Sequence, residues 1–144
     1  MKVSSLLATK NPTVITIHPD QSIADAVELY SQYNIGSLIV VDQDGHLAGI
    51  LSERDIVRRL PAYENILAAA VREIMTPRVI VATPQDDIMS VAHTMTEKRF
   101  RHMPVMDEGE LVGIISIGDI IKCQRDQYRG EIATLETQIM AEKG

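Results

Sequence analysis

Aromatic residues and cysteine are almost absent from this sequence. Aromatics make up 3% of the 144 residues, with no tryptophan and one phenylalanine, so aliphatic side chains and methionine must fill the core. The one cysteine, Cys123, cannot form an internal disulfide. No apolar run approaches the roughly 20 residues of a membrane-spanning helix, and no apolar stretch typical of a signal peptide follows the first residues. We therefore expect a cytoplasmic protein.

Positive charge and catalytic signatures are scarce as well. Lysine and arginine number 14 against 20 aspartates and glutamates, and the net charge of −6 opposes binding to nucleic acid or to an anionic membrane. The sequence has no GxSxG, no GxGxxG and no P-loop motif. Its four histidines form no pair at helical spacing and no chelating set. We therefore expect no enzyme, no catalytic cofactor and no metal site.

What the chain does have is an internal repeat. Residues 14–27 align with residues 79–92 at a shift of 65. After one deletion the shift becomes 64, and a Gly-x-x-Ser-x-x-Asp motif occurs at both 49–55 and 113–119. So many matches in one order indicate a duplication of a unit of about 60 residues, which is too short to bury its apolar face well alone.

Each unit predicts the same order of elements, strand, helix, strand, strand, helix. The first helix of each unit starts at a favoured N-cap residue, Ser22 or Asp87. Hairpin signals join the two following strands. The expected strands lie at 14–17, 37–41 and 47–51, and again at 79–81, 103–106 and 111–116. The second helix of each unit begins near Asp55 or Asp119. We expect an α+β fold with a first repeat at 1–62, a linker at 63–70, a second repeat at 71–124 and a helical tail at 125–144.

The tail departs from the repeat and carries an apolar stripe. Tyr128, Ile132, Leu135 and Ile139 follow one another at intervals of four, three and four residues. The run is too short to establish a coiled coil by itself. We expect the stripe to pack on the rest of the chain or on a second copy.

The repeated motifs are Gly49-Ile-Leu-Ser52-Glu-Arg-Asp55 and Gly113-Ile-Ile-Ser116-Ile-Gly-Asp119, with 71–77 before the second unit and 101–107 at its middle strand. Over about residues 3–124 these features resemble the CBS domain, named for cystathionine β-synthase, and the chain resembles one tandem CBS pair. The resemblance implies two βαββα repeats with pseudo-two-fold symmetry and clefts that bind adenosine nucleotides such as AMP, ADP, ATP, NAD or S-adenosylmethionine. It also implies a homodimer. Because nothing in the sequence points to catalysis, we expect the output of such a module to be a regulated partner protein.

The Ser–Asp pairs of the two motifs suit the sugar and phosphate of a nucleotide. Ser52 and Ser116 stand where a strand turns into a helix, and their hydroxyls, with the free amides of a helix start, suit a phosphate. Asp55 and Asp119, three residues later, would repel phosphate but can accept hydrogen bonds from a ribose diol. The alternative is that the two aspartates only cap their helices.

Residues 98–102 form the densest basic stretch of this acidic chain. Arg99 and Arg101, with His102 beside them, could bind phosphate oxygens through their guanidinium groups. The alternative is a solvated run of charge. We favour the binding role, because the resemblance places this segment at a cleft.

The two clefts are not expected to be equivalent. The first repeat has Gly36 and Ser37 where the second has its basic stretch, and Arg54 is the one cation near its motif. We therefore expect the second cleft, with Ser116, to be the tighter phosphate site. The alternative is that Arg99 reaches across to the first cleft.

The resemblance also implies where adenine lies, at the turn after the first strand of each half and beside the second motif. The residues are Ile17, His18, Ala82, Thr83, Met75, Thr76, Met103 and Pro104. For the methionines, a plain core position is the better interpretation from sequence alone.

These observations predict a sensor module that binds an adenosine nucleotide, AMP first, with NAD(H) or ATP as further candidates, and that signals to a partner protein. The alternative is an interaction scaffold whose clefts are vestigial. Intact serine and aspartate in both motifs favour the sensor.

Overall fold

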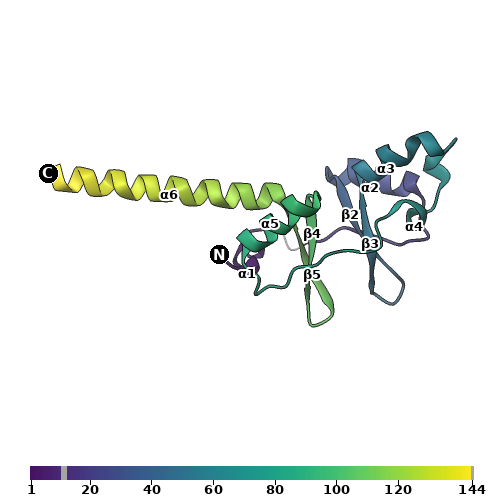
Figure 1. Ribbon diagram of the computed structural model, residues 1–144, viewed down its shortest axis with the longest axis horizontal. Helices are drawn as coiled ribbons and strands as arrows, with labels where there is room; N and C mark the ends of the chain where they lie inside the picture. The colour runs from purple at the N-terminus through teal and green to yellow at the C-terminus, as the bar shows by residue number, and fades with distance from the viewer. Residues whose placement is uncertain (11–12, 144) are drawn as a thin grey trace.

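Two similar halves lie side by side in the computed structural model, and a long helix projects from the second (Figure 1). The structure describes residues 1–10 and 13–143, with side chains described as far as residue 139. In the first half, β1 (Thr16–Ile17) pairs in parallel with β2 (Ser37–Val41), which pairs antiparallel with β3 (Leu47–Ser52). In the second half, β4 (His102–Asp107) pairs antiparallel with β5 (Glu110–Ser116). The predicted α+β fold of two related halves is confirmed.

Helices alternate with these strands in the order that the repeat predicts. The first half contains α2 (Ile23–Tyr33) and α3 (Glu53–Arg59), and the second contains α5 (Ile88–Lys98) and α6 (Ile117–Lys143). Ser22 caps α2 and Asp87 caps α5 through hydrogen bonds to amides of the first turn. Both helices end at a residue with positive φ, Asn34 (52°) and Arg99 (60°). The two repeats therefore also end their first helix in the same backbone conformation.

The first strand of each half is shorter than the sequence predicts. In the first half only Thr16 and Ile17 pair with β2. In the second half no strand forms at 79–81, and a single bridge joins Ala82 to Val105. The strand predicted at 79–81 is therefore wrong, and residues 78–80 instead form an irregular segment that lines a cavity between the halves.

Each half contains its own core, and the short helix that precedes each repeat packs on the other half. Helix α1 (Val3–Leu7) lies in the core of the second half, and α4 (Val71–Ile74) lies in that of the first. The backbone contacts match as well, since Val3 N donates to Asp86 O and Val71 N donates to Gln21 O, both at 2.8 Å. Two 3₁₀ turns, Leu60–Ala62 and Ile66–Ala68, lead into α4. The halves are thus joined by an exchange of helices.

Helix α6 continues without a break from the second motif to Lys143, so the predicted tail is an extension of the last helix of the repeat. Its first turns contact α1, α5 and β5, and the rest extends away from the body (Figure 1). The stripe side chains are more than half exposed, from 51% at Ile139 to 66% at Tyr128. The expected packing of the stripe on the chain itself is therefore wrong. In the described ranges no helix is long and apolar enough to cross a membrane.

Candidate functional site

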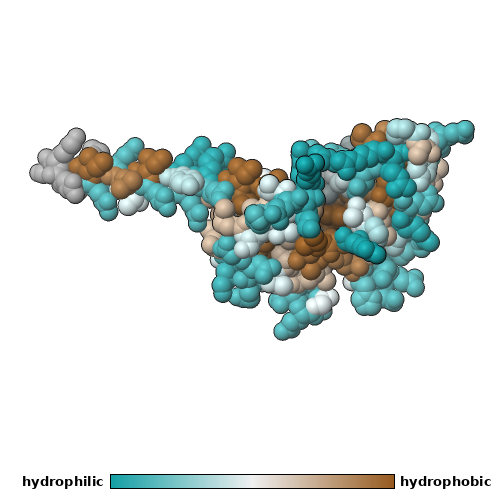
Figure 2. All heavy atoms as spheres, viewed as in Figure 1, coloured by the Kyte–Doolittle hydropathy of each residue, from teal (hydrophilic) through white to brown (hydrophobic). Residues whose placement is uncertain are grey.

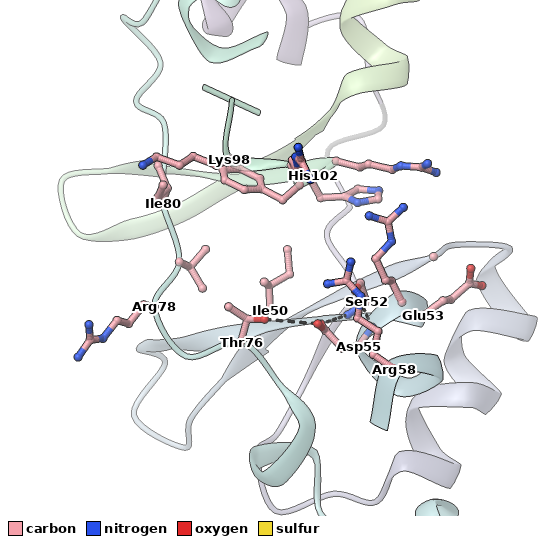
Figure 3. A pocket seen from close by; sticks show the side chains of 16 residues that line it. Ile50, Ser52, Glu53, Asp55, Arg58, Thr76, Arg78, Ile80, Lys98 and His102 are labelled. Carbon is pink, nitrogen blue, oxygen red and sulfur yellow. Dashed lines mark hydrogen bonds between the residues drawn. The ribbon is translucent and has the colours of Figure 1, made fainter. Parts of the chain in front are cut away.

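A cavity of about 450 Å³ lies between the two halves, within the usual size range of ligand pockets. Figure 3 shows Ser52, Asp55 and Thr76 on one wall and Lys98 and His102 on the opposite wall. Both repeats contribute to the lining, the second one also through its entry segment at 76–80. The lining residues are Gly36, Ile50, Ser52, Glu53, Arg54, Asp55, Arg58, Thr76, Arg78, Val79, Ile80, Lys98, Arg99, Phe100, Arg101 and His102.

The motif of the first repeat forms a capping box at the start of α3. Asp55 N donates to Ser52 Oγ at 3.2 Å, and Ser52 N donates to Asp55 Oδ2 at 2.9 Å. The amide of Glu53 is also used, because it donates to Gly36 O at 3.0 Å. The free amides expected at this helix start are therefore partly occupied. The Ser52 hydroxyl keeps its proton to donate, and Asp55 Oδ1 faces the hydroxyl of Thr76 at 3.5 Å.

Backbone pairing holds Thr76 beside this motif. Ile50 and Thr76 exchange two backbone hydrogen bonds, of 2.9 and 3.0 Å. The close approach is possible because Gly49 has no side chain, and a Cβ there would lie 2.6 Å from Thr76 O. Thr76 thus reaches the cavity although it belongs to the entry of the second repeat.

The basic segment of the second repeat lies in the cavity of the first motif. Arg99, Arg101 and His102 line the same cavity as Ser52 and Asp55, whereas Ser116 and Asp119 do not line it. The expectation that the arginines serve Ser116 is wrong, and the alternative, that Arg99 reaches across, is the arrangement seen. The reason is geometric, since the two halves face each other and the loop after α5 points at the first motif.

The cavity is strongly positive although the protein is acidic. Six cationic side chains line it, against the two carboxylates of Glu53 and Asp55, an excess of four positive charges. The cations are Arg54, Arg58, Arg78, Lys98, Arg99 and Arg101. Among the described residues none of the six makes an ion pair or a side-chain hydrogen bond. Such an unneutralised cluster attracts anions.

The second motif has a different environment, because a lysine of the chain itself forms an ion pair with the carboxylate of Asp119. Lys10 Nζ lies 2.5 Å from Asp119 Oδ2 and also donates to Ile114 O at 2.7 Å. The hollow beside them holds only about 80 Å³. Burial acts to raise the pKa of Asp119, but the hydrogen bonds from Lys10 and Ser116 outweigh it and hold that pKa below its usual value. The carboxylate of the second motif is thus neutralised from within the chain, and Ser116 and Asp119 do not line the small hollow beside it.

His102 lies between the large cavity and the Asp119–Lys10 pair of the second motif. It lines the large cavity, and it interacts electrostatically with Asp119 and Lys10 on the other side. Burial lowers the pKa of His102, and Lys10 and Arg101 lower it further against the opposing effect of Asp119. We therefore expect a neutral imidazole at pH 7.

Half of the eight residues that were predicted to contact adenine are buried. Ile17, Ala82, Met103 and Pro104 are buried, so they are unavailable to a ligand in this structure. His18, Met75 and Thr83 are more accessible but do not line the large cavity, and the buried Ser37 does not line it either. Of this group Thr76 alone reaches the cavity.

Sequence reasoning missed part of the lining. Ile50, Val79, Ile80 and Phe100 supply its apolar surface, and Glu53, Arg58, Arg78 and Lys98 supply charge. Arg58 had a detectable signal, because it follows Arg54 by one helical turn and so lies on the same face of α3. The segment 78–80 gave no such signal, since its apolar residues predicted a strand.

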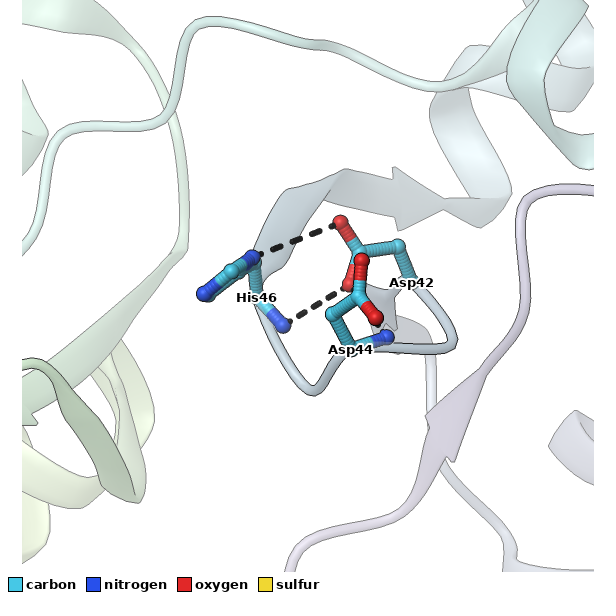
Figure 4. Close-up of side chains that lie close together, drawn as sticks. All are labelled: Asp42, Asp44 and His46. Atoms are coloured by element: carbon cyan, nitrogen blue, oxygen red, sulfur yellow. Dashed lines mark hydrogen bonds and ion pairs between the residues drawn. The ribbon is translucent and has the colours of Figure 1, made fainter.

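The hairpin between β2 and β3 brings Asp42, Asp44 and His46 together, with one ligand atom from each within 4.8 Å of the others. Asp42 Oδ1 accepts hydrogen bonds from the backbone amides of Asp44 and His46, both at 2.9 Å, and Figure 4 shows the three side chains around this turn. These bonds explain the cluster as a means of closing the hairpin. The sequence did not predict this cluster, because the aspartates of 42–45 were interpreted only as residues of the hairpin turn.

Comparison with known proteins gives one consistent family. The model of the CBS domain matches residues 3–62 and 71–126. The CBS domain-containing protein CBSX3, mitochondrial, of Arabidopsis thaliana is 33% identical over 125 residues, which are 83% of this chain, and the chain spans 61% of its length.

Solved structures agree with this match. The CBS-domain containing protein ATU1752 from Agrobacterium tumefaciens has a TM-score of 0.82 at 37% identity, over 85% of this chain and 92% of that one. The CBS domain pair of protein MJ0100, solved in complex with 5'-methylthioadenosine and S-adenosyl-L-methionine, has a TM-score of 0.77 at 30% identity, over 88% of this chain and 98% of that one.

Proposed function

Because the chain belongs to the CBS domain family, we propose that it is a regulatory module that binds an adenosine nucleotide, AMP first, in the cavity between its two repeats. NAD(H) and ATP are the further candidates. A related CBS pair was solved with two adenosine-containing ligands, which supports the ligand class. We further infer that the module is a homodimer and transmits binding to a partner protein.

The observation that carries the proposal is the set of six cations without ion-pair partners that surrounds the first motif. A guanidinium forms short, charge-assisted hydrogen bonds with phosphate oxygens, often two at a time. An excess of four positive charges in a protein of net charge −6 would be unfavourable without an anion. A phosphate group satisfies this requirement, and a neutral nucleoside would not.

The remaining lining suits the other parts of a nucleotide. Asp55 Oδ1 and the Thr76 hydroxyl lie together, and they can accept from and donate to a ribose diol. Ile50, Val79 and Ile80 provide an apolar surface of the kind that a base requires. We therefore assign ribose to the Asp55 wall and phosphate to the arginines opposite.

Regulation requires that the nucleotide favour one conformation or assembly over another. The cavity is lined by α3 and β3 from one half and by the α5–β4 loop from the other. A ligand that contacts both walls therefore favours the arrangement in which they stand at the right separation. A partner that contacts both halves could sense this change.

The alternative of a vestigial cleft suits the second motif. Lys10 already neutralises Asp119, and the adjoining hollow of about 80 Å³ is far below the usual size of a ligand pocket. We therefore expect one nucleotide per chain, bound at the first motif.

The test is calorimetric titration of nucleotide-free protein with AMP, ATP, NAD, NADH, S-adenosylmethionine and adenosine. Arg101→Ala should weaken AMP binding by about 1.5–3 kcal/mol, roughly tenfold or more, while adenosine binding hardly changes. Arg129→Ala, on the projecting part of α6, is the control and should change neither. If Arg101→Ala weakens adenosine as much as AMP, the arginine has a structural role and the phosphate assignment is wrong.

Ribose recognition is tested by Asp55→Asn, which keeps an oxygen to accept the capping bond from Ser52. The variant should lose about 1.5–3 kcal/mol of AMP affinity and most of its preference for AMP over 2'-deoxy-AMP. The matched variant Asp119→Asn should leave both unchanged. Failure of the parent to bind any of the nucleotides would instead support an interaction scaffold.

A further inference from the structure

The exposed stripe of α6 is a surface that needs a partner. Ile121, Tyr128, Ile132, Leu135 and Ile139 are each between 51% and 66% exposed. Their spacing, with Arg125 in the remaining position, is the alternating three-and-four pattern of a coiled-coil seam. Figure 2 shows apolar residues along the part of the helix that projects from the body. An isolated helix with such a face is marginally stable in water.

The charges beside the seam indicate what covers it. The half of the helix from residue 121 to 130 carries Lys122, Arg125 and Arg129 against Asp126, a net charge of +2. The half from 131 to 139 carries Glu131 and Glu136 with no cation, a net charge of −2. A second copy of the helix that runs in the opposite direction places each half against the half of opposite charge. The surface is therefore complementary to itself.

We propose that α6 pairs with α6 of a second copy in an antiparallel coiled coil centred near residue 130. The layers of the seam then join Ile121 to Ile139, and Tyr128 to Ile132, of the two copies. Arg125 lies opposite Leu135, so its aliphatic stem covers an apolar side chain while its charged end reaches solvent. The two-fold symmetry makes each contact occur twice.

A parallel pair is the less favourable arrangement for the same residues. It would place Arg125 against Arg125 within the seam, and it would bring Glu131 beside Glu136 of the other copy. The antiparallel pair instead brings Lys122 beside Glu136 of the other copy, twice, and these two contacts offset the single contacts of Arg129 with Arg129 and of Glu131 with Glu131 at its centre. The dipoles of the two helices point in opposite directions in the antiparallel pair, and this arrangement is electrostatically favourable. In a parallel pair they would point in the same direction.

The test is sedimentation equilibrium of the full chain without nucleotide, so that its outcome does not depend on the proposed ligand. Ile132→Glu puts a carboxylate into the seam of both copies and should raise the dissociation constant of the self-association by roughly a hundredfold. Thr137→Glu introduces the same charge on the outer face of the helix and should change it little. Circular dichroism confirms that each variant is folded.

The direction of the pair is tested by Glu136→Lys. It should weaken self-association several-fold in the antiparallel pair, because Lys122 then faces a lysine, and the double variant Lys122→Glu/Glu136→Lys should restore it. Strengthening by Glu136→Lys would indicate a parallel pair and overturn the proposal. A monomeric parent, or equal effects of Ile132→Glu and Thr137→Glu, would also overturn it and point to another protein or another surface as the interface.

Discussion

Ser52 and Asp55 illustrate how one residue can serve the fold and a ligand together. Asp55 uses Oδ2 for the capping box and keeps Oδ1 for the cavity. Capping alone is no sign of a site, because Ser22 and Asp25 form the same box at α2 and do not line the large cavity. From the sequence, capping and ligand binding were alternative roles for Asp55, but in the structure the two roles are compatible. What distinguishes Asp55 is the surrounding cavity.

Lys10 gives a prediction at the same scale. The pKa of Asp119 is held down mainly by Lys10 and Ser116 against burial. A carboxyl whose pKa is lowered on folding stabilises the protein above its unfolded pKa of about 4, and this contribution is lost as pH falls through the folded pKa. Lys10→Met should therefore destabilise the protein at pH 7, by about 1 kcal/mol because both side chains are partly exposed.

The measurement is urea unfolding of parent and Lys10→Met at pH 7 and pH 3. The difference in unfolding free energy should be smaller at pH 3 than at pH 7, because the stabilisation from the lowered pKa of Asp119 begins to be lost below the unfolded pKa of about 4. Lys2→Met removes an exposed lysine whose side chain donates to the neutral side chain of Gln85, and it serves as the control. A difference that is the same at both pH values would show that Lys10 acts by packing rather than by its charge.

At the scale of elements, the β2–β3 and β4–β5 hairpins are close copies, including a register shift at the same place, Val40/Val41 and Val105/Met106. The glycines that follow meet different neighbours. A Cβ at Gly49 would lie 2.6 Å from the backbone oxygen of Thr76, and a Cβ at Gly113 would lie 2.8 Å from the end of the Leu7 side chain. Backbone cannot move as easily as a leucine methyl group.

We therefore expect Gly49→Ala to cost more stability than Gly113→Ala. The first should cost about 1–3 kcal/mol by overpacking, and the second less, because Leu7 can rotate. Gly49→Ala should also weaken AMP binding, since it displaces Thr76 from the Asp55 wall. Urea unfolding and titration of the two variants provide the measurements. Equal costs would mean that the Ile50–Thr76 contact is more compliant than its two hydrogen bonds suggest.

For the molecule as a whole, the sequence was informative about what repeats and uninformative about how the repeats meet. The internal repeat predicted the helices, the hairpin and the motif of each half, because these depend on local pattern. It could not assign Arg101 to a motif, because that depends on the mutual orientation of the halves. It also could not show that Lys10 would reach Asp119, 109 residues away, since no local signal records that contact.

The exchange of α1 and α4 allows a final prediction on the whole molecule. Leu6 is 1% exposed in the core of the second half, and Ile74 is 3% exposed in the core of the first. Truncating either to alanine should cost about 2–5 kcal/mol. Leu6→Ala should speed amide hydrogen exchange in α5, β4 and β5, and Ile74→Ala should speed it in α2, β2 and β3.

Ser5→Ala, at an exposed residue of α1, is the control. If each truncation instead loosened the half that follows it in the sequence, α1 and α4 would not pack on the opposite halves as described. If both truncations loosened both halves equally, the two cores would unfold as one cooperative unit, and a ligand between them would stabilise both together.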